Sequence, residues 1–64
     1  MTNHQAWNET RYAVNHLRNA RNSLVLAGAK RAAAKVRLAL KSAEGAERHA
    51  YVRMMAANRG ERDD

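Results

Sequence analysis

The apolar residues of this chain follow an alternation of four and three residues over almost its whole length. Such an alternation places them on one face of an α-helix and is typical of a coiled-coil seam. No proline interrupts the chain, residues with high helix propensity dominate, and strand-like alternation is missing. We therefore expect an all-α fold.

The alternation has two parts that are out of phase with each other. The first seam consists of Ala6, Thr10, Ala13, Leu17, Ala20, Leu24 and Ala27. The second consists of Ala29, Ala33, Val36, Leu40, Ala43, Ala50, Met54 and Ala57, with Glu47 as its one polar member. Because the first seam cannot continue past Ala27 without burying basic residues, we expect the chain to reverse at Gly28.

These seams predict an antiparallel helical hairpin with an alanine-rich interface, since small residues let two helices approach closely. The expected helices run from about Asn3 to Leu26 and from Ala29 to Asn58. Thr2 and Gln5 have the spacing of a capping box, although Asn3 is a rival cap, and Gly60 is expected to adopt a left-handed conformation. We treat residues 1–60 as a single domain and residues 61–64 as a disordered acidic tail.

Two alternatives stay open at the glycines. No good cap precedes the second helix, and Lys30 and Arg31 oppose its dipole, so a kinked continuous helix can replace the turn. Gly45 is unfavourable inside a helix, and Ser42 can cap a new one, which allows a three-helix arrangement.

A chain of 64 residues without cysteine is too short to bury a large core alone. We therefore expect it to dimerise into a four-helix bundle. Large apolar residues beside the seams would then be covered by a second copy, or would bind another protein. The residues that we assign to this stripe are Trp7, Val14, Leu38, Val52 and Met55.

The sequence favours neither an enzyme nor a metal site. His4, His16 and His49 have no metal-ligand spacing, and no glycine-rich loop suits a phosphate. We expect no cofactor. The start of the sequence lacks the features of a signal peptide, and its apolar runs are too short for a membrane span, so we expect a cytoplasmic protein with no membrane partner.

Charge gives the strongest functional indication. The formal net charge is +6, and no acid occurs between Arg11 and Lys41. On the outer face of the first helix, asparagine and arginine recur at steps of three and four residues, with Arg21 beside them. The repeating residues are Asn8, Arg11, Asn15, Arg18 and Asn22. A second basic set opens the second helix and consists of Lys30, Arg31, Lys35, Arg37 and Lys41.

Arginine, lysine and asparagine are suited to phosphates, base edges and 2′-hydroxyls. The sequence therefore predicts a small basic accessory or regulatory protein that binds nucleic acid, either RNA or DNA, without catalysis. A polar, solvated helix face is the plainer interpretation of the same pattern. The alternative function is a small adaptor or inhibitor that binds a partner protein through the apolar stripe.

Overall fold

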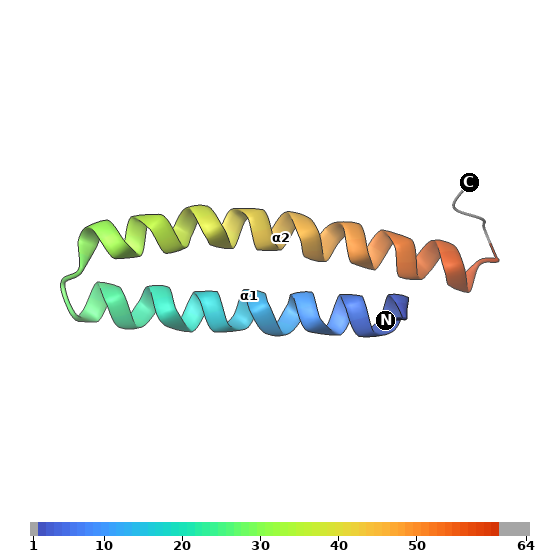
Figure 1. Cartoon of the computed structure of the whole chain (residues 1–64), viewed down its shortest axis with the longest axis horizontal. Coiled ribbons are helices and arrows are strands. Elements are labelled where there is room, and N and C mark those ends of the chain that lie inside the picture. Colours follow the sequence, from blue (N-terminus) through green and yellow to red (C-terminus); the bar gives the residue numbers. More distant parts are fainter. Residues whose placement is uncertain (1, 61–64) are drawn as a thin grey trace.

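The computed structural model describes residues 2–60 and has two helices, α1 (Asn3–Leu26) and α2 (Lys30–Asn58). The helices run antiparallel, side by side, and are joined by a short turn (Figure 1). The predicted all-α hairpin is confirmed, and the second helix begins only one residue later than expected. The predicted tail at 61–64 lies outside the described residues.

The start of α1 is fixed by the capping box that the sequence predicts. The Gln5 amide donates to the Thr2 hydroxyl oxygen at 3.1 Å, and the Thr2 amide donates to Gln5 Oε1 at 2.8 Å. These bonds satisfy amide groups that have no partner inside the helix. Thr2 is therefore the cap, and the rival cap Asn3 is the first residue of the helix.

The reversal depends on Gly28, whose φ of 76° lies in the left-handed region. The Gly28 amide donates to the Val25 carbonyl at 3.0 Å, and the Ala29 amide donates to the Leu24 carbonyl at 2.9 Å. This pair of bonds is a Schellman motif, which ends α1 and turns the chain. A kinked continuous helix is thereby excluded. Gly60 has the same conformation after α2, with a φ of 77°.

The second helix has the poor N-cap that its sequence predicts, and it continues without a break through Gly45. Its N-cap, Ala29, makes no side-chain capping bond. Gly45 lies inside α2, so the three-helix alternative is wrong. The chain tolerates this glycine because the seam residues on both sides of it, Leu40 and Ala50, are buried against α1 in one phase.

The predicted seam of α2 is largely confirmed. Ala33, Leu40, Ala50 and Met54 are buried, and the remaining members are partly buried except for the last. Ala57 is exposed, so its assignment to the seam was wrong. The reason is length, because α2 continues beyond the start of α1 and its last turn has no helix opposite it (Figure 1).

The predicted seam of α1 is wrong in three of its four alanine layers. Ala13, Ala20 and Ala27 are exposed and Ala6 is only partly buried, whereas Val14 is 1% exposed. Every second seam position is shifted by one residue, so that the inner face consists of Trp7, Thr10, Val14, Leu17, Arg21 and Leu24. The predicted and observed faces share Thr10, Leu17 and Leu24.

The rotation follows from the area that each face buries. Trp7 and Val14 remove more apolar surface from water than Ala6 and Ala13 would. Its cost is small, because Arg21 is only partly buried and an arginine can cover apolar surface with its stem while its charge stays in water. Thr10 is part-buried, and its hydroxyl donates to the Ala6 and Trp7 carbonyls at 3.0 and 2.8 Å.

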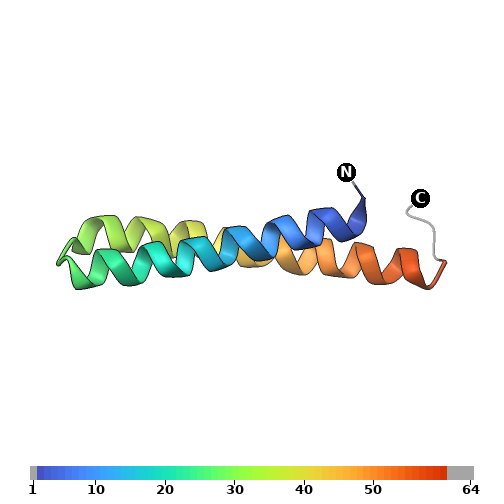
Figure 2. The ribbon, with the colours of Figure 1, turned by 90° about the horizontal axis from the view of Figure 1, so that it is seen from below.

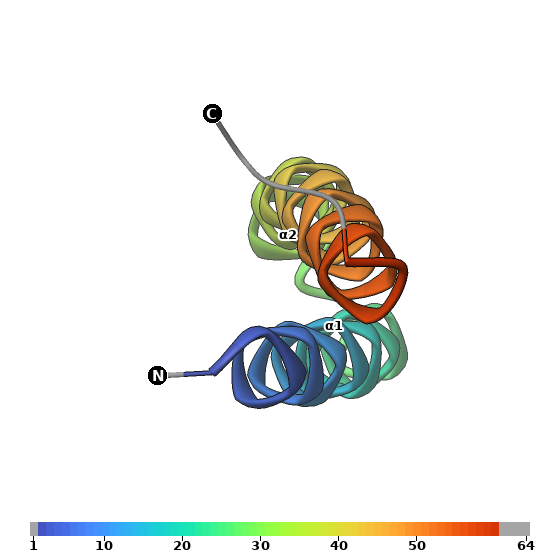
Figure 3. The same cartoon turned by 90° about the vertical axis from the view of Figure 1, so that its right-hand side faces the viewer.

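The hairpin is a thin rod of 48 × 16 × 15 Å. Its radius of gyration is 14.7 Å, whereas a compact domain of this length has about 11 Å. Seen from two further directions, the helices cross at a shallow angle and leave both of their flanks uncovered (Figures 2 and 3). Among residues 2–60, the buried core is limited to Val14, Ala33, Leu40, Ala50 and Met54.

The observed rotation of α1 predicts unequal effects for two valines. Val14→Ala should lower the free energy of unfolding by about 1–3 kcal/mol, because two buried methyl groups are lost. Val52→Ala should change it by less than about 0.5 kcal/mol, because Val52 is 60% exposed. Urea denaturation of both variants at one protein concentration, followed by far-ultraviolet circular dichroism, measures the difference. Equal effects would contradict the observed orientation of α1.

Candidate nucleic-acid interface

The observed seam brings basic residues of both helices to one side of the hairpin. On one side of each helix stand the residues that directly follow seam residues, as Arg18 follows Leu17 and Glu44 follows Ala43. Arg18 Nη2 lies 3.2 Å from Glu44 Oε2, which shows that these two rows meet across the helices. We call this side the basic flank. It carries Asn8, Arg11, Asn15, Arg18, Asn22, Lys30, Arg37, Lys41 and Arg48.

The part of the basic flank on α1 is a regular polar strip. Asn8, Arg11 and Asn15 line a shallow hollow of about 100 Å³ together with Tyr12. The guanidinium carbon of Arg11 lies 4.8 Å from the centre of the Trp7 ring, which holds Arg11 against the hairpin. The Trp7 ring itself lies 5.4 Å from the Tyr51 ring of α2. Aromatic packing therefore holds the end of the strip that lies farther from the turn.

Most cations of the basic flank are not neutralised within the part of the chain that the structure describes. Glu44 is the one acid on this flank, and its pair with Arg18 is exposed to solvent, with 49% and 33% of the two side chains accessible. Arg11, Lys30, Arg37, Lys41 and Arg48 make no ion pair within residues 2–60. Their charges are free to act on an anionic ligand.

Three of the predicted basic residues do not join this flank. Arg21 is partly buried in the seam, and its Nε and Nη2 atoms donate to Asn22 Oδ1 at 3.3 and 3.1 Å. Arg31 and Lys35 are exposed on other sides of α2, away from the side that carries Lys30 and Arg37. The structure thus divides the second predicted basic set.

Arg48 belongs to the basic flank but was not identified from the sequence. The signal was present, because Arg48 stands one residue after the seam residue Glu47 and seven residues after Lys41. The sequence analysis missed Arg48 because Glu47 directly precedes it and because it lies outside the acid-free segment.

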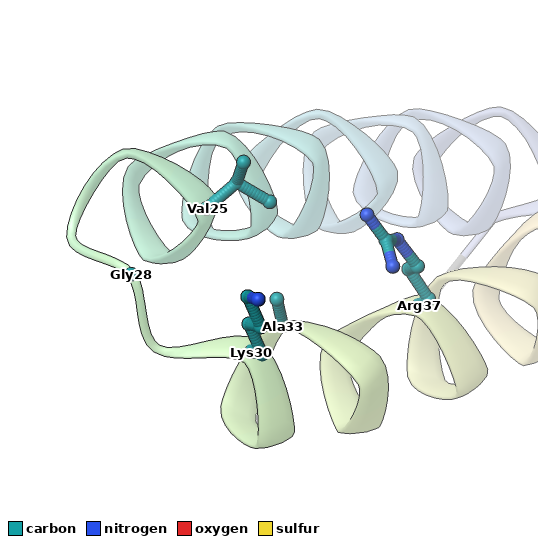
Figure 4. A pocket seen from close by; sticks show the side chains of 5 residues that line it. All are labelled: Val25, Gly28, Lys30, Ala33 and Arg37. Carbon is teal, nitrogen blue, oxygen red and sulfur yellow. The ribbon is translucent and has the colours of Figure 1, made fainter.

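A second hollow lies at the turn end of the basic flank. It has a volume of about 340 Å³ and is lined by Val25, Gly28, Lys30, Ala33 and Arg37. Figure 4 shows Lys30 and Arg37 extending from α2 toward α1, with the small Ala33 between them and Val25 on the other helix. Two cationic side chains therefore border a depression whose remaining walls are apolar and small.

The apolar stripe that the sequence assigns to a protein partner does not form one surface. Val14 is buried between the helices, so its placement on that stripe was wrong. Trp7 packs on Tyr51, and Met55 is partly buried. Leu38 and Val52 are 69% and 60% exposed, and their spacing places them on the side of α2 that faces away from α1.

Within residues 2–60, neither helix has the length and apolar character needed to cross a bilayer. The same residues contain no group of three histidine, cysteine or acidic side chains that could hold a metal ion. Comparison with known proteins finds no matching family model, curated protein or solved structure.

The exposed pair between Arg18 and Glu44 is expected to contribute little to stability. Glu44→Gln should change the free energy of unfolding by less than about 1 kcal/mol, because solvent screens such pairs. Arg18→Gln should give a similarly small change, since each substitution removes the same pair. Thermal denaturation of both variants, at low and high salt, tests this. A loss well above that size would show that the pair helps to align the helices.

Proposed function

We propose that this chain is a small, non-catalytic nucleic-acid-binding accessory or regulatory protein that contacts phosphates through the basic flank. The observation that carries the proposal is the convergence of cations from both helices on one side of the hairpin. Six lysine and arginine side chains stand there against one acid, Glu44. A field of this kind attracts polyanions and favours binding that is steeply dependent on salt.

The flank combines two kinds of contact. Arginine and lysine bind phosphates, whereas the asparagines Asn8, Asn15 and Asn22 offer both donors and acceptors to base edges or 2′-hydroxyls. The α2 part of the flank, from Lys30 to Arg48, extends over about 27 Å at 1.5 Å per residue. That length matches about eight base pairs of duplex.

The expected specificity is low. The basic flank is formed by two helices side by side, which together are too wide for the major groove of B-DNA, about 12 Å across. Most contacts should therefore be made to the backbone. Both RNA and DNA are candidate ligands, and the binding experiment includes both.

Binding should be weakened by Arg11→Gln together with Arg18→Gln, and far less by Arg31→Gln together with Lys35→Gln. Both double variants lose two positive charges, but only the first loses them from the basic flank. Mobility shifts with duplex, single-stranded and hairpin RNA and DNA ligands at several salt concentrations measure the effect. On duplex, the first variant should reduce the slope of log K against log salt by about 2, because each phosphate contact contributes about 0.9.

Two results would contradict this proposal in different ways. If the unaltered protein shifts none of the ligands at low salt, nucleic-acid binding is wrong. If both double variants weaken binding equally, only the net charge matters, and the assignment to the basic flank is wrong.

We also propose that the hairpin acts as a homodimer that forms a four-helix bundle. Its thin core and its large radius of gyration support this assembly, because a second rod alongside would cover one exposed flank. The flank opposite the basic one suits such a contact, since charge is sparse there. The residues that precede seam residues on that side are Ala6, Ala13, Ala20, Ala27, Ala32, Ala39 and Ala46, and the row ends in one charged residue, Arg53.

Ala13→Glu and Ala39→Glu should each raise the dissociation constant of the dimer by about tenfold or more. A carboxylate buried without a partner costs more than the 1.4 kcal/mol that corresponds to tenfold. Ala34→Glu is the matched control, because Ala34 is exposed on the other side of α2. Sedimentation equilibrium at micromolar concentrations measures all three. A stable, folded monomer before any substitution would overturn the dimer, and an equal effect of the control would place the interface elsewhere.

The adaptor function is the weaker alternative. Leu38 and Val52 remain exposed and offer apolar contacts, but Val14 is no longer available and Trp7 is engaged with Tyr51. Within residues 2–60, the stripe predicted to bind a partner protein does not form a continuous surface, whereas the basic flank extends along both helices.

A further inference from the structure

We infer that the hollow at the turn is a binding site for a phosphate group, and that its preferred ligand is the terminal phosphate of a nucleic-acid strand. The site consists of Lys30 and Arg37 as the anion-binding groups and of Val25 and Ala33 as its apolar wall. This inference rests on the proposed function for the identity of the strand, but the phosphate site itself does not depend on it.

The geometry places two cations along one hollow. Lys30 and Arg37 are two turns apart on the same side of α2, so their Cα atoms are separated by about 10.5 Å along the helix. Figure 4 shows both side chains reaching toward α1 along the hollow. Side chains of this length can close on one group that lies between them, and Ala33 leaves the space for it.

Without a ligand, the positive charges at the hollow are not neutralised by any acid within residues 2–60. Neither Lys30 nor Arg37 forms an ion pair within residues 2–60. The one acid of the basic flank, Glu44, is paired with Arg18, two turns from Arg37. The N-terminus of α2, which lacks a side-chain cap, adds positive partial charge at the same end of the hairpin. An anion in the hollow would relieve the repulsion between these groups.

The charge of the site favours a terminal phosphate over an internal one. A phosphomonoester carries a charge of about −1.5 to −2 near pH 7, which matches two cations, whereas an internal phosphodiester carries one charge. The hollow also lies where the basic flank ends at the turn. A strand that lies along the flank and ends at the turn would place its terminal phosphate in the hollow, with Val25 beside its last sugar.

The first experiment uses inorganic phosphate alone. The ¹H–¹⁵N NMR signals of the protein are followed during titration with phosphate at constant ionic strength, with chloride as the reference salt. The Arg37 Nε–H signal and the amide signals from Val25 to Ala33 should shift. Lys30→Gln or Arg37→Gln should abolish these shifts, and Arg31→Gln and Lys35→Gln should keep them. Circular dichroism verifies that each variant remains helical. Absence of shifts in the unaltered protein, or their retention in both site variants, would overturn the site.

The second experiment identifies the source of the phosphate. A 12-nucleotide single strand is compared with and without a 5′-phosphate, and in a third version with a 3′-phosphate. At least one phosphorylated strand should bind about three- to tenfold more tightly than the unmodified strand, and Arg37→Gln should remove that difference. Equal binding of all three strands would overturn the strand-end assignment. If no strand binds while inorganic phosphate still shifts the signals, the proposed function fails and the site instead takes free phosphate or a small phosphorylated molecule.

Discussion

The register of the α1 seam determines nearly everything else about the surface of this molecule. Leu17 and Leu24 can face α2 together with Ala13 or together with Val14, and the larger apolar area of Val14 and Trp7 decides in favour of the second arrangement. Because the two faces share Leu17 and Leu24, they differ by about half of the 100° step between neighbouring residues. This rotation moves the alanine row out of the interface onto one flank, and it brings Arg11 and Arg18 to the edge where they face α2.

The local signals in the sequence were sufficient for the helix ends. A capping box, two glycines with positive φ and a Schellman motif are each made by a few neighbouring residues, so their patterns predict the structure directly. The α2 seam was also predictable, because leucine and methionine mark it without a competing row. In α1, two rows shared Thr10, Leu17 and Leu24, and the rule that alanine permits close approach favoured the wrong one. The choice depends on how much area each row buries against α2, and no local pattern contains that information.

The candidate site shows the same division between local and long-range information. The asparagine and arginine strip on α1 could be identified from its spacing, since it lies on one helix. Its continuation on α2 could not, because the side of α2 that meets this strip depends on both seams at once. Lys30 and Arg37 join the strip, Arg31 and Lys35 do not, and Arg48 was missed. Arg21 was assigned to the charged surface, but the observed register places it in a partly buried seam position, where its guanidinium donates to Asn22.

The two flanks of the hairpin therefore differ in what they can bind. One flank concentrates cations that the hairpin leaves mostly unpaired, and the other presents alanine from both helices with little charge. If a second hairpin packs on the alanine flank, the two basic flanks face outward on opposite sides of the bundle, where their mutual repulsion is weakest. Each dimer would then have two separate surfaces for nucleic acid, with one phosphate hollow at the turn end of each. Such an arrangement can hold two strands or two segments of one strand at a fixed separation, which is a role that a single basic hairpin cannot perform.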